Sequence, residues 1–152
     1  MIEYRKGNIL KSGAAAIVVP VNCVDVAGKG LALAAKKTWP RWYRDYAGYC
    51  RAHALCPGDV LLHQPEVADR PRLVSFASKD HWRNPTNIEW VMRGLGTLAE
   101  MMQQVQPSSI ALSAVGCGNG LLSWSDVCPL IHAAAERMSA AGVDVFVYEP
   151  ME

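Results

Sequence analysis

The stretch from residue 14 to residue 35 decides the fold class, and it reads AAAIVVPVNCVDVAGKGLALAA. Its first part, Ala14–Val21, is an apolar run rich in alanine and valine, which is typical of a strand covered on both faces. A loop with Gly28 and Gly30 follows, and good helix formers come next, from Leu31 to Lys37. A buried strand that leads through a glycine-rich loop into a helix predicts an α/β protein.

Strands and helices alternate in the same way along the rest of the chain. Pro40 separates the first helix from a second over about 41–53, because the residue before a proline avoids the helical region. A turn is predicted at Pro57-Gly58. Further strands are predicted at 60–62, 73–76, 110–115 and 143–148, with a polar connection over 66–70 between the first two.

The clearest helix is predicted over 87–104, and the start of another is predicted near 123–126. Pro129 must lie early in that last helix, which favours Ser125 as its N-cap, and Gly142 ends it. This order predicts a mixed or parallel sheet flanked by helices, in one domain over 1–152. In the helix over 87–104, apolar residues recur at steps of three and four and form one stripe toward a sheet: Ile88, Val91, Met92, Leu95, Leu98, Ala99 and Met102.

The composition excludes several classes of protein. With 51% apolar and 19% charged residues, the chain is neither disordered nor fibrous. No stretch approaches the ~20 apolar residues of a membrane span, and the N-terminus does not resemble a secretory signal, so we expect no membrane association and a cytoplasmic protein. The net charge of +1 allows only a local basic patch for nucleic acid. The five cysteines show no C-x-x-C spacing, so we expect reduced thiols, buried or nearly so, and no metal site.

Three informative segments follow predicted strands directly, namely 22–30, 78–83 and 116–120. Because ligands in such sheets bind outside the carboxyl ends of the strands, we expect these segments to meet at one edge. Two of them are glycine-rich, and such loops let a backbone approach an anion closely. Neither matches the Walker or the dinucleotide fingerprint, and each alone is better explained by a tight turn without a ligand. Two such loops together favour a diphosphate site.

Lys79, just past the end of a predicted strand, is either a solvated charge or a nucleophile or charge stabiliser. The second role requires partial desolvation or a cationic neighbour, and Arg83 is the cation nearest to it in sequence. His81 is either a base or a loop-stabilising residue. Trp82 either packs or, with Arg83, stacks on a base and contacts phosphate. Asn8 either contacts an adenine edge or occupies a turn.

Together these motifs resemble a macrodomain. The similarity is strongest to the antitoxin macrodomains of the DarT/DarG system, which remove ADP-ribose from thymidine bases in DNA, and weaker to the terminal ADP-ribose protein glycohydrolase of animals. The resemblance implies a three-layer sandwich with a mixed central sheet. The motifs that carry it span nearly the whole chain: Gly7-Asn8-Ile9-Leu10, Val21-Asn22-Cys23, Gly28-Lys29-Gly30-Leu31-Ala32, Ser78-Lys79-Asp80-His81-Trp82-Arg83, and Gly116-Cys117-Gly118 with Trp124.

The resemblance also implies a site for ADP-ribose, as ligand or product, without a further cofactor. Lys79 matches the lysine that is essential in both subgroups. Asn8 stands where macrodomains usually carry an aspartate that contacts the adenine amine, and Asp25 stands where many hydrolytic members carry an asparagine that faces the distal ribose. The other expected ligand contacts are Ile9, Asn22, Gly28, Lys29, Gly30, Gly116, Cys117, Gly118, Asn119 and Gly120.

One departure concerns Gly120, which stands where the animal glycohydrolase carries an aspartate that pairs with the lysine. The antitoxin subgroup also lacks this aspartate, so the departure supports that assignment. It leaves the general acid or base unidentified.

We therefore expect a hydrolase that removes ADP-ribose from thymidine-type bases in single-stranded DNA. The alternatives are a glycohydrolase for ADP-ribose on protein carboxylates and a non-catalytic ADP-ribose reader. The expected DNA contacts are His81, Trp82 and Arg83, with Lys36, Lys37 and Arg41 toward the backbone. We also expect a monomer and an ADP-ribosyltransferase toxin as partner. Antitoxins of this kind carry a further C-terminal domain, whereas this sequence ends at Glu152, so we expect enzymatic reversal rather than direct neutralisation of a toxin.

Overall fold

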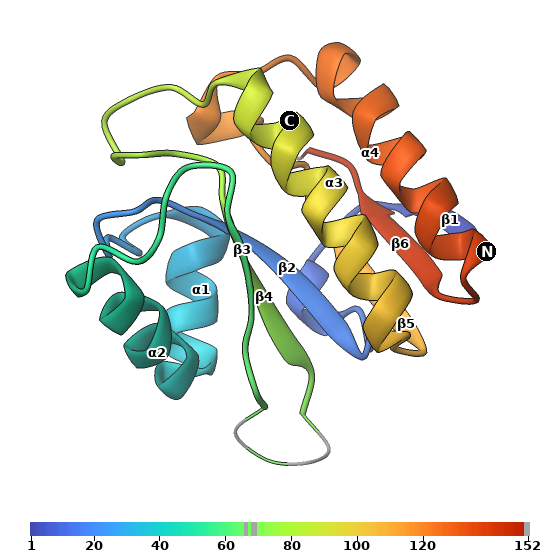
Figure 1. Cartoon of the computed structure of the whole chain (residues 1–152), viewed down its shortest axis with the longest axis horizontal. Helices are drawn as coiled ribbons and strands as arrows, with labels where there is room; N and C mark the ends of the chain where they lie inside the picture. The colour runs from blue at the N-terminus through green and yellow to red at the C-terminus, as the bar shows by residue number, and fades with distance from the viewer. Residues whose placement is uncertain (66, 68–69, 151–152) are drawn as a thin grey trace.

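A computed structural model describes residues 1–65, 67 and 70–150, and it places a six-stranded sheet between two layers of helices (Figure 1). The polar connection predicted over 66–70 lies partly outside the described residues. The strands are β1 (Ile2–Arg5), β2 (Ala16–Val21), β3 (Val60–Leu62), β4 (Arg72–Ala77), β5 (Ser109–Leu112) and β6 (Asp144–Tyr148). The helices are α1 (Gly30–Thr38), α2 (Pro40–Arg51), α3 (Ile88–Val105) and α4 (Trp124–Ala140), with short 3₁₀ turns η1 (Ile9–Lys11) and η2 (Gly118–Gly120).

The strands follow the order β1-β6-β5-β2-β4-β3, and the sheet is mixed, as predicted. β3 runs antiparallel to β4, whereas the other neighbouring pairs are parallel. β2 is central: it pairs with β4 along its whole length and with β5 at Ala16 and Ile17. The carboxyl ends of β2, β4 and β5 therefore open at the same edge of the sheet.

Alternate residues of β2 enter two different cores, which explains why this strand has no charged position. Ala16 and Val18 pack with the buried residues of α3 and α4. Ile17, Val19 and Val21 pack on the other face with the buried residues of α1 and α2. Successive side chains of a strand point to opposite faces, so a strand between two helical layers must be apolar throughout.

The apolar stripe predicted for α3 is largely confirmed, because Val91, Leu95, Leu98, Ala99 and Met102 are all buried. Met92 was wrongly placed in the stripe. It is 54% exposed, because its position lies just outside one edge of the buried face of α3. Gly94 belongs to the buried face although it has no side chain. The ring of Phe76 on β4 fills the space that a β-carbon at Gly94 would need.

The end of β5 and the start of α4 differ from the prediction. The strand predicted over 110–115 ends at Leu112, because Ser113 turns away to bond the Val18 carbonyl and a turn follows. The N-cap of α4 is Ser123 rather than Ser125, so Pro129 lies within the helix. Pro129 removes one backbone hydrogen bond from the helix. The cost is offset by the burial of Val127 and by the packing of Trp124 against the core.

All five cysteines are free, but Cys56, in the loop before β3, is exposed, contrary to the expectation that all would be buried or nearly so. Among the described residues, no helix combines the length and apolar character needed to cross a membrane.

Candidate functional site

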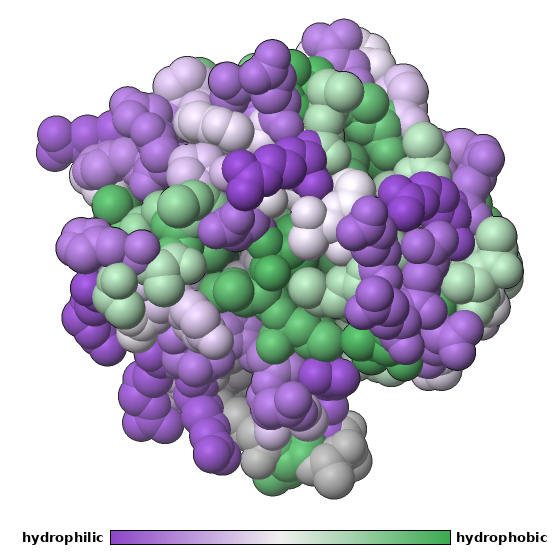
Figure 2. All heavy atoms as spheres, in the orientation of Figure 1, coloured by the Kyte–Doolittle hydropathy of each residue, from purple (hydrophilic) through white to green (hydrophobic). Residues whose placement is uncertain are grey.

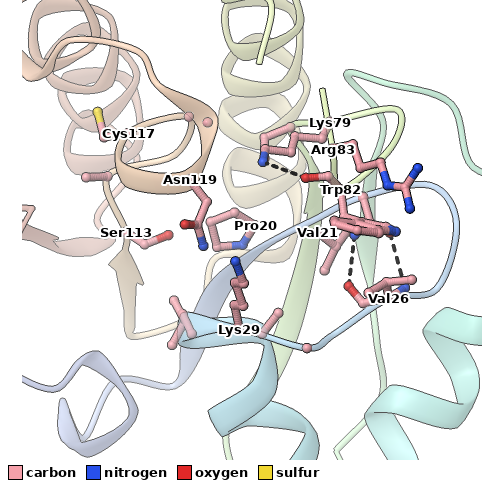
Figure 3. Close-up of a pocket in the computed structure, with 18 residues that line it drawn as sticks. Pro20, Val21, Val26, Lys29, Lys79, Trp82, Arg83, Ser113, Cys117 and Asn119 are labelled. Atoms are coloured by element: carbon pink, nitrogen blue, oxygen red, sulfur yellow. Dashed lines mark hydrogen bonds between the residues drawn. The ribbon is translucent and has the colours of Figure 1, made fainter. Parts of the chain in front are cut away.

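A cavity of about 700 Å³ opens at the sheet edge where β2, β4 and β5 end (Figure 3). This volume suits a ligand of nucleotide size. All three segments singled out in the sequence contribute to the cavity, so their predicted convergence is confirmed. The lining residues are Pro20, Val21, Asn22, Val26, Gly28, Lys29, Leu31, Ala32, Ser78, Lys79, Trp82, Arg83, Ser113, Ala114, Gly116, Cys117, Asn119 and Gly120.

Asn22 shapes the loop that leaves β2. Its Oδ1 accepts the backbone N–H groups of Val24 and Val26, over 3.1 and 3.3 Å, and its Nδ2 donates to the Val26 carbonyl over 2.8 Å. The hydroxyl of Tyr46 on α2 donates to the Asn22 carbonyl over 2.7 Å. Most of the hydrogen-bonding capacity of this buried amide is thus used to hold the loop, so Asn22 positions the cavity wall.

The loop that carries Lys79 is fastened to the end of β2. The N–H of Ser78 donates to the Val21 carbonyl over 3.1 Å, and the N–H of Cys23 donates to the Asp80 carbonyl over 3.2 Å. The thiol of Cys23 donates to the Lys79 carbonyl over 3.3 Å. Burial raises the pKa of Cys23 to about 12, so this thiol stays protonated and keeps donating. The backbone on both sides of Lys79 is therefore fixed.

The side chain of Lys79 lies in a partly buried, electropositive place. Its Nζ donates to the Trp82 carbonyl over 3.3 Å. Partial burial and, secondarily, the positive charge of Lys29 lower the pKa of Lys79 from its ordinary value. Desolvation and a cationic neighbour are the conditions that activate a lysine, and both are present. The cation that acts on the pKa of Lys79 is Lys29, not the sequence neighbour Arg83.

Lys29 connects the cavity with the start of α1. It is the N-cap residue of that helix, and Figure 3 shows its side chain, with those of Lys79 and Asn119, directed toward the cavity from three different loops. Within the described residues no side chain caps the first turn of α1, so its backbone N–H groups can bind an anion. Asn119 Nδ2 lies 3.8 Å from the β-carbon position of Gly30, so the two glycine-rich loops face each other.

In the loop over 116–120, the surroundings of Gly116 and Gly120 leave no room for a side chain. A β-carbon at Gly116, where φ is +83°, would lie 2.7 Å from Leu122 Cδ1. A β-carbon at Gly120 would overlap Thr86 Oγ1. The carboxylate that the animal glycohydrolase carries at this point is thus sterically excluded here. Among the described lining residues of the cavity there is no aspartate or glutamate.

Trp82 and Arg83 form one lip of the cavity. Trp82 is 43% exposed, and the Arg83 guanidinium carbon lies 4.7 Å from the centre of its ring. The ring of His81 also packs against Trp82, with ring centres 5.5 Å apart, and its Nδ1 accepts the backbone N–H of Arg83 over 3.1 Å. His81 therefore holds the loop in shape and does not itself line the cavity.

Some of the predicted ligand contacts are not among the residues that line the cavity: Asn8, Ile9, Asp25, Gly30 and Gly118. Asn8 caps η1, because its Oδ1 accepts the Leu10 N–H over 3.0 Å, and Ile9 is buried in the core beside α1 and α2. Asp25 has a φ of +55°, and its carbonyl accepts the Tyr43 hydroxyl over 2.9 Å. Their contacts with ADP-ribose stay predictions.

The sequence did not identify Ser113, which lines the cavity and is buried apart from 8% of its surface. Its Oγ donates to the Val18 carbonyl over 3.1 Å. Ser113 was hidden inside the strand predicted over 110–115. The available signal was its position as the first polar residue after the apolar run of β5, because the carboxyl ends of strands face the site.

These features define an α/β sandwich with a cavity between two glycine-rich loops at the carboxyl edge of the sheet. No family model matches the chain. Curated relatives include the DNA ADP-ribosyl glycohydrolases of Thermus aquaticus, 37% identical over 100% of this chain, and of Mycobacterium tuberculosis, 32% identical over 99%. The chain spans only 42% of the length of either relative.

Solved structures agree with these relatives. The macrodomain of Mycobacterium tuberculosis DarG superposes with a TM-score of 0.93 at 32% identity, and that of Thermus aquaticus DarG with 0.90 at 36%; each match covers 99% of both chains. Thermosipho africanus DarTG in complex with ADP-ribose superposes with a TM-score of 0.91 at 28% identity, over 99% of this chain and 42% of that one. The chain belongs to the macrodomain family and, within it, to the DarG group.

Proposed function

We propose that this chain removes ADP-ribose from a thymidine-type base in single-stranded DNA and so reverses the action of a DarT-like ADP-ribosyltransferase toxin, its proposed partner. The observation that carries the proposal is the position of Lys79, partly buried in the cavity beside a second cation. The names of the curated relatives support the reaction, and the complex of Thermosipho africanus DarTG supports the ligand. We propose that the protein acts as a cytoplasmic monomer.

In this proposal the diphosphate of ADP-ribose lies between the two glycine-rich loops. The uncapped N–H groups at the start of α1 and the Lys29 ammonium stabilise its negative charge. Gly28 and Gly116 allow the backbone to approach the ligand closely. The distal ribose then lies toward Lys79, and the base that leaves lies toward Trp82. The loops contribute to the rate by positioning the ribose.

Lys79 acts in one of two ways. As a nucleophile, its neutral amine forms a bond to the anomeric carbon while the bond from that carbon to the base nitrogen breaks. The base leaves with the bonding electron pair and takes a proton from water, and a second water then displaces the lysine to release ADP-ribose. As a charge stabiliser, the ammonium instead stabilises negative charge that develops on the departing base, and water attacks the anomeric carbon directly.

The test is incubation of the protein with an oligonucleotide that contains ADP-ribosylated thymidine, with the products followed by mass spectrometry. We expect released ADP-ribose and an unmodified oligonucleotide, and a loss of at least ~100-fold in rate for Lys79→Ala. Lys79→Arg keeps the charge but cannot supply a neutral amine, so it separates the two routes. An untouched oligonucleotide, or full activity in Lys79→Ala, refutes the proposal.

A second candidate function is a non-catalytic ADP-ribose reader, which the lack of a carboxylate among the described lining residues favours. A reader binds ADP-ribose tightly and turns over neither modified DNA nor peptides that carry ADP-ribose on glutamate. Assaying both substrates side by side also tests the alternative of a glycohydrolase for protein carboxylates, which predicts the faster rate on the peptide.

A further inference from the structure

The charges of the chain are divided unevenly between the two helical layers. Residues 29–51, which hold α1 and α2, contain six basic residues and one acidic residue. Residues 88–140, which hold α3 and α4, contain two basic and four acidic residues. The net charge of +1 for the whole chain therefore conceals a strongly basic layer on one side of the sheet.

The outer face of α2 carries the exposed part of this basic layer. Arg44 and Arg51 are exposed, and neither has an ion pair among the described residues. Asp45, the acidic residue of the layer, contacts His63 Nδ1 over 2.6 Å. Arg44 and Arg51 are two helical turns apart, about 10 Å along the axis. Figure 2 shows mostly hydrophilic side chains over the outer side of α2, at the left of the view.

The helix α2 packs against the loop that forms one wall of the cavity. The Tyr46 hydroxyl of α2 donates to the Asn22 carbonyl over 2.7 Å, and the Tyr43 hydroxyl donates to the Asp25 carbonyl over 2.9 Å. The middle of α2 thus supports this loop.

We propose that the outer face of α2 is a track for the DNA strand on one side of the modified nucleotide. Arg44 and Arg51, which lie on the same side of the helix, contact successive phosphate groups. Cationic groups that follow the backbone are a general feature of single-strand binding sites. The proposal rests on the proposed function, because it assigns the path of that substrate over the surface.

A purely structural role accounts for only part of the basic layer. Lys36, Lys37 and Arg51 lie in the last turns of α1 and α2, where positive charge stabilises the helix dipole. Arg44 lies in the middle of α2, where the dipole gives no such benefit. Its exposure without an ion pair therefore supports a surface that receives an anion from outside.

The experiment measures binding of unmodified single-stranded DNA by fluorescence anisotropy, at several salt concentrations. Oligonucleotides of about 15 and about 4 nucleotides are compared for the wild type, for Arg44→Gln with Arg51→Gln, and for Arg93→Gln with Arg137→Gln. The last pair removes the same charge from α3 and α4. Thermal unfolding verifies that both pairs fold.

We expect the α2 pair to bind the longer oligonucleotide roughly fivefold or more weakly, with the slope of log affinity against log salt reduced by about 1.4 for two lost phosphate contacts. The α3–α4 pair should change affinity by less than about twofold. Equal effects of the two pairs, or an equal loss on the short oligonucleotide, overturn the track. Because hydrolysis plays no part in this measurement, failure of the proposed reaction is seen separately, as an unchanged ADP-ribosylated oligonucleotide.

Discussion

Thr86 packs directly on Gly120: its backbone N–H donates to the Gly120 carbonyl over 2.9 Å, and its side chain fills the space that a β-carbon at position 120 would need. This contact joins the loop before α3 to the glycine-rich loop of the cavity. Thr86 Oγ1 is buried and has no hydrogen-bond partner among the described residues. The contact of the Thr86 side chain with Gly120 is therefore purely steric, and it explains why glycine stands at position 120.

Gly120→Ala should destabilise the protein by about 1–3 kcal/mol, because the new methyl group is forced against Thr86. It should also weaken ADP-ribose binding, because the 116–120 loop has to move. Thr86→Ala removes the overlapping hydroxyl, so the double variant should recover part of the loss. Urea unfolding and calorimetric titration with ADP-ribose provide the measurements. Additive destabilisation in the double variant would show that the two residues are not coupled.

The rate of ADP-ribose release should depend on pH through Lys79, whose pKa is lowered mainly by burial and further by Lys29. If the neutral amine attacks, the rate rises with pH to a plateau. The inflection of this rise lies at a pH below the ordinary lysine pKa of about 10.4. Lys29→Met removes a positive charge and should shift this inflection to higher pH, because the pKa of Lys79 increases. If the ammonium acts by its charge, the rate instead falls with rising pH.

The shift of the inflection is the result that isolates the coupling of the two lysines. Lys29→Met also weakens ADP-ribose binding, so the profile is measured at saturating substrate. Lys36→Met, which removes an equal charge at the other end of α1, is the matched control and should leave the inflection in place. An unchanged inflection in Lys29→Met would mean that Lys29 has no effect on the reacting group.

The sequence predicted the elements that depend on local pattern, and it missed relationships between distant residues. The apolar run of β2 and the stripe of α3 indicated burial, and the positions of the strand ends indicated where the cavity lies. The coupling of Lys29 with Lys79, however, joins residues fifty positions apart in the sequence. No periodicity reports such a pair, because it depends on how two loops meet at the sheet edge.

Stability should fall on acidification because of the buried residue His63. Ser75 Oγ accepts the Trp42 Nε1–H over 3.0 Å and lies 2.7 Å from His63 Nε2, so Ser75 donates to a neutral ring whose Nδ1–H contacts Asp45 over 2.6 Å. Burial lowers the pKa of His63 more than Asp45 raises it. The unfolded state therefore binds the proton more readily than the folded state does.

The stabilisation from neutral His63 is complete above the unfolded pKa of about 6.5 and is lost as the pH falls from there toward the lower folded value. We expect the free energy of unfolding to decrease between pH 7.5 and 5.5, by at most about 1.4 kcal/mol per pH unit from this residue. His63→Gln should be less stable at pH 7.5 and lose less on acidification. Urea unfolding at a series of pH values measures this, and parallel curves for the two proteins would contradict it.

Gly94 and Gly96 offer a matched pair within α3. A β-carbon at Gly94 would overlap the ring of Phe76, whose side chain is fully buried, whereas a β-carbon at Gly96 meets nothing within 4 Å. Gly94→Ala should therefore destabilise the protein by about 1–3 kcal/mol through overpacking. Gly96→Ala should stabilise it by roughly 0.5–1 kcal/mol, because alanine is the better helix former. Chemical unfolding of both variants gives the difference, and Phe76→Leu with Gly94→Ala should recover part of the loss. Equal effects at the two positions would show that the sheet and α3 separate easily, which is incompatible with Phe76 filling the place of the missing side chain.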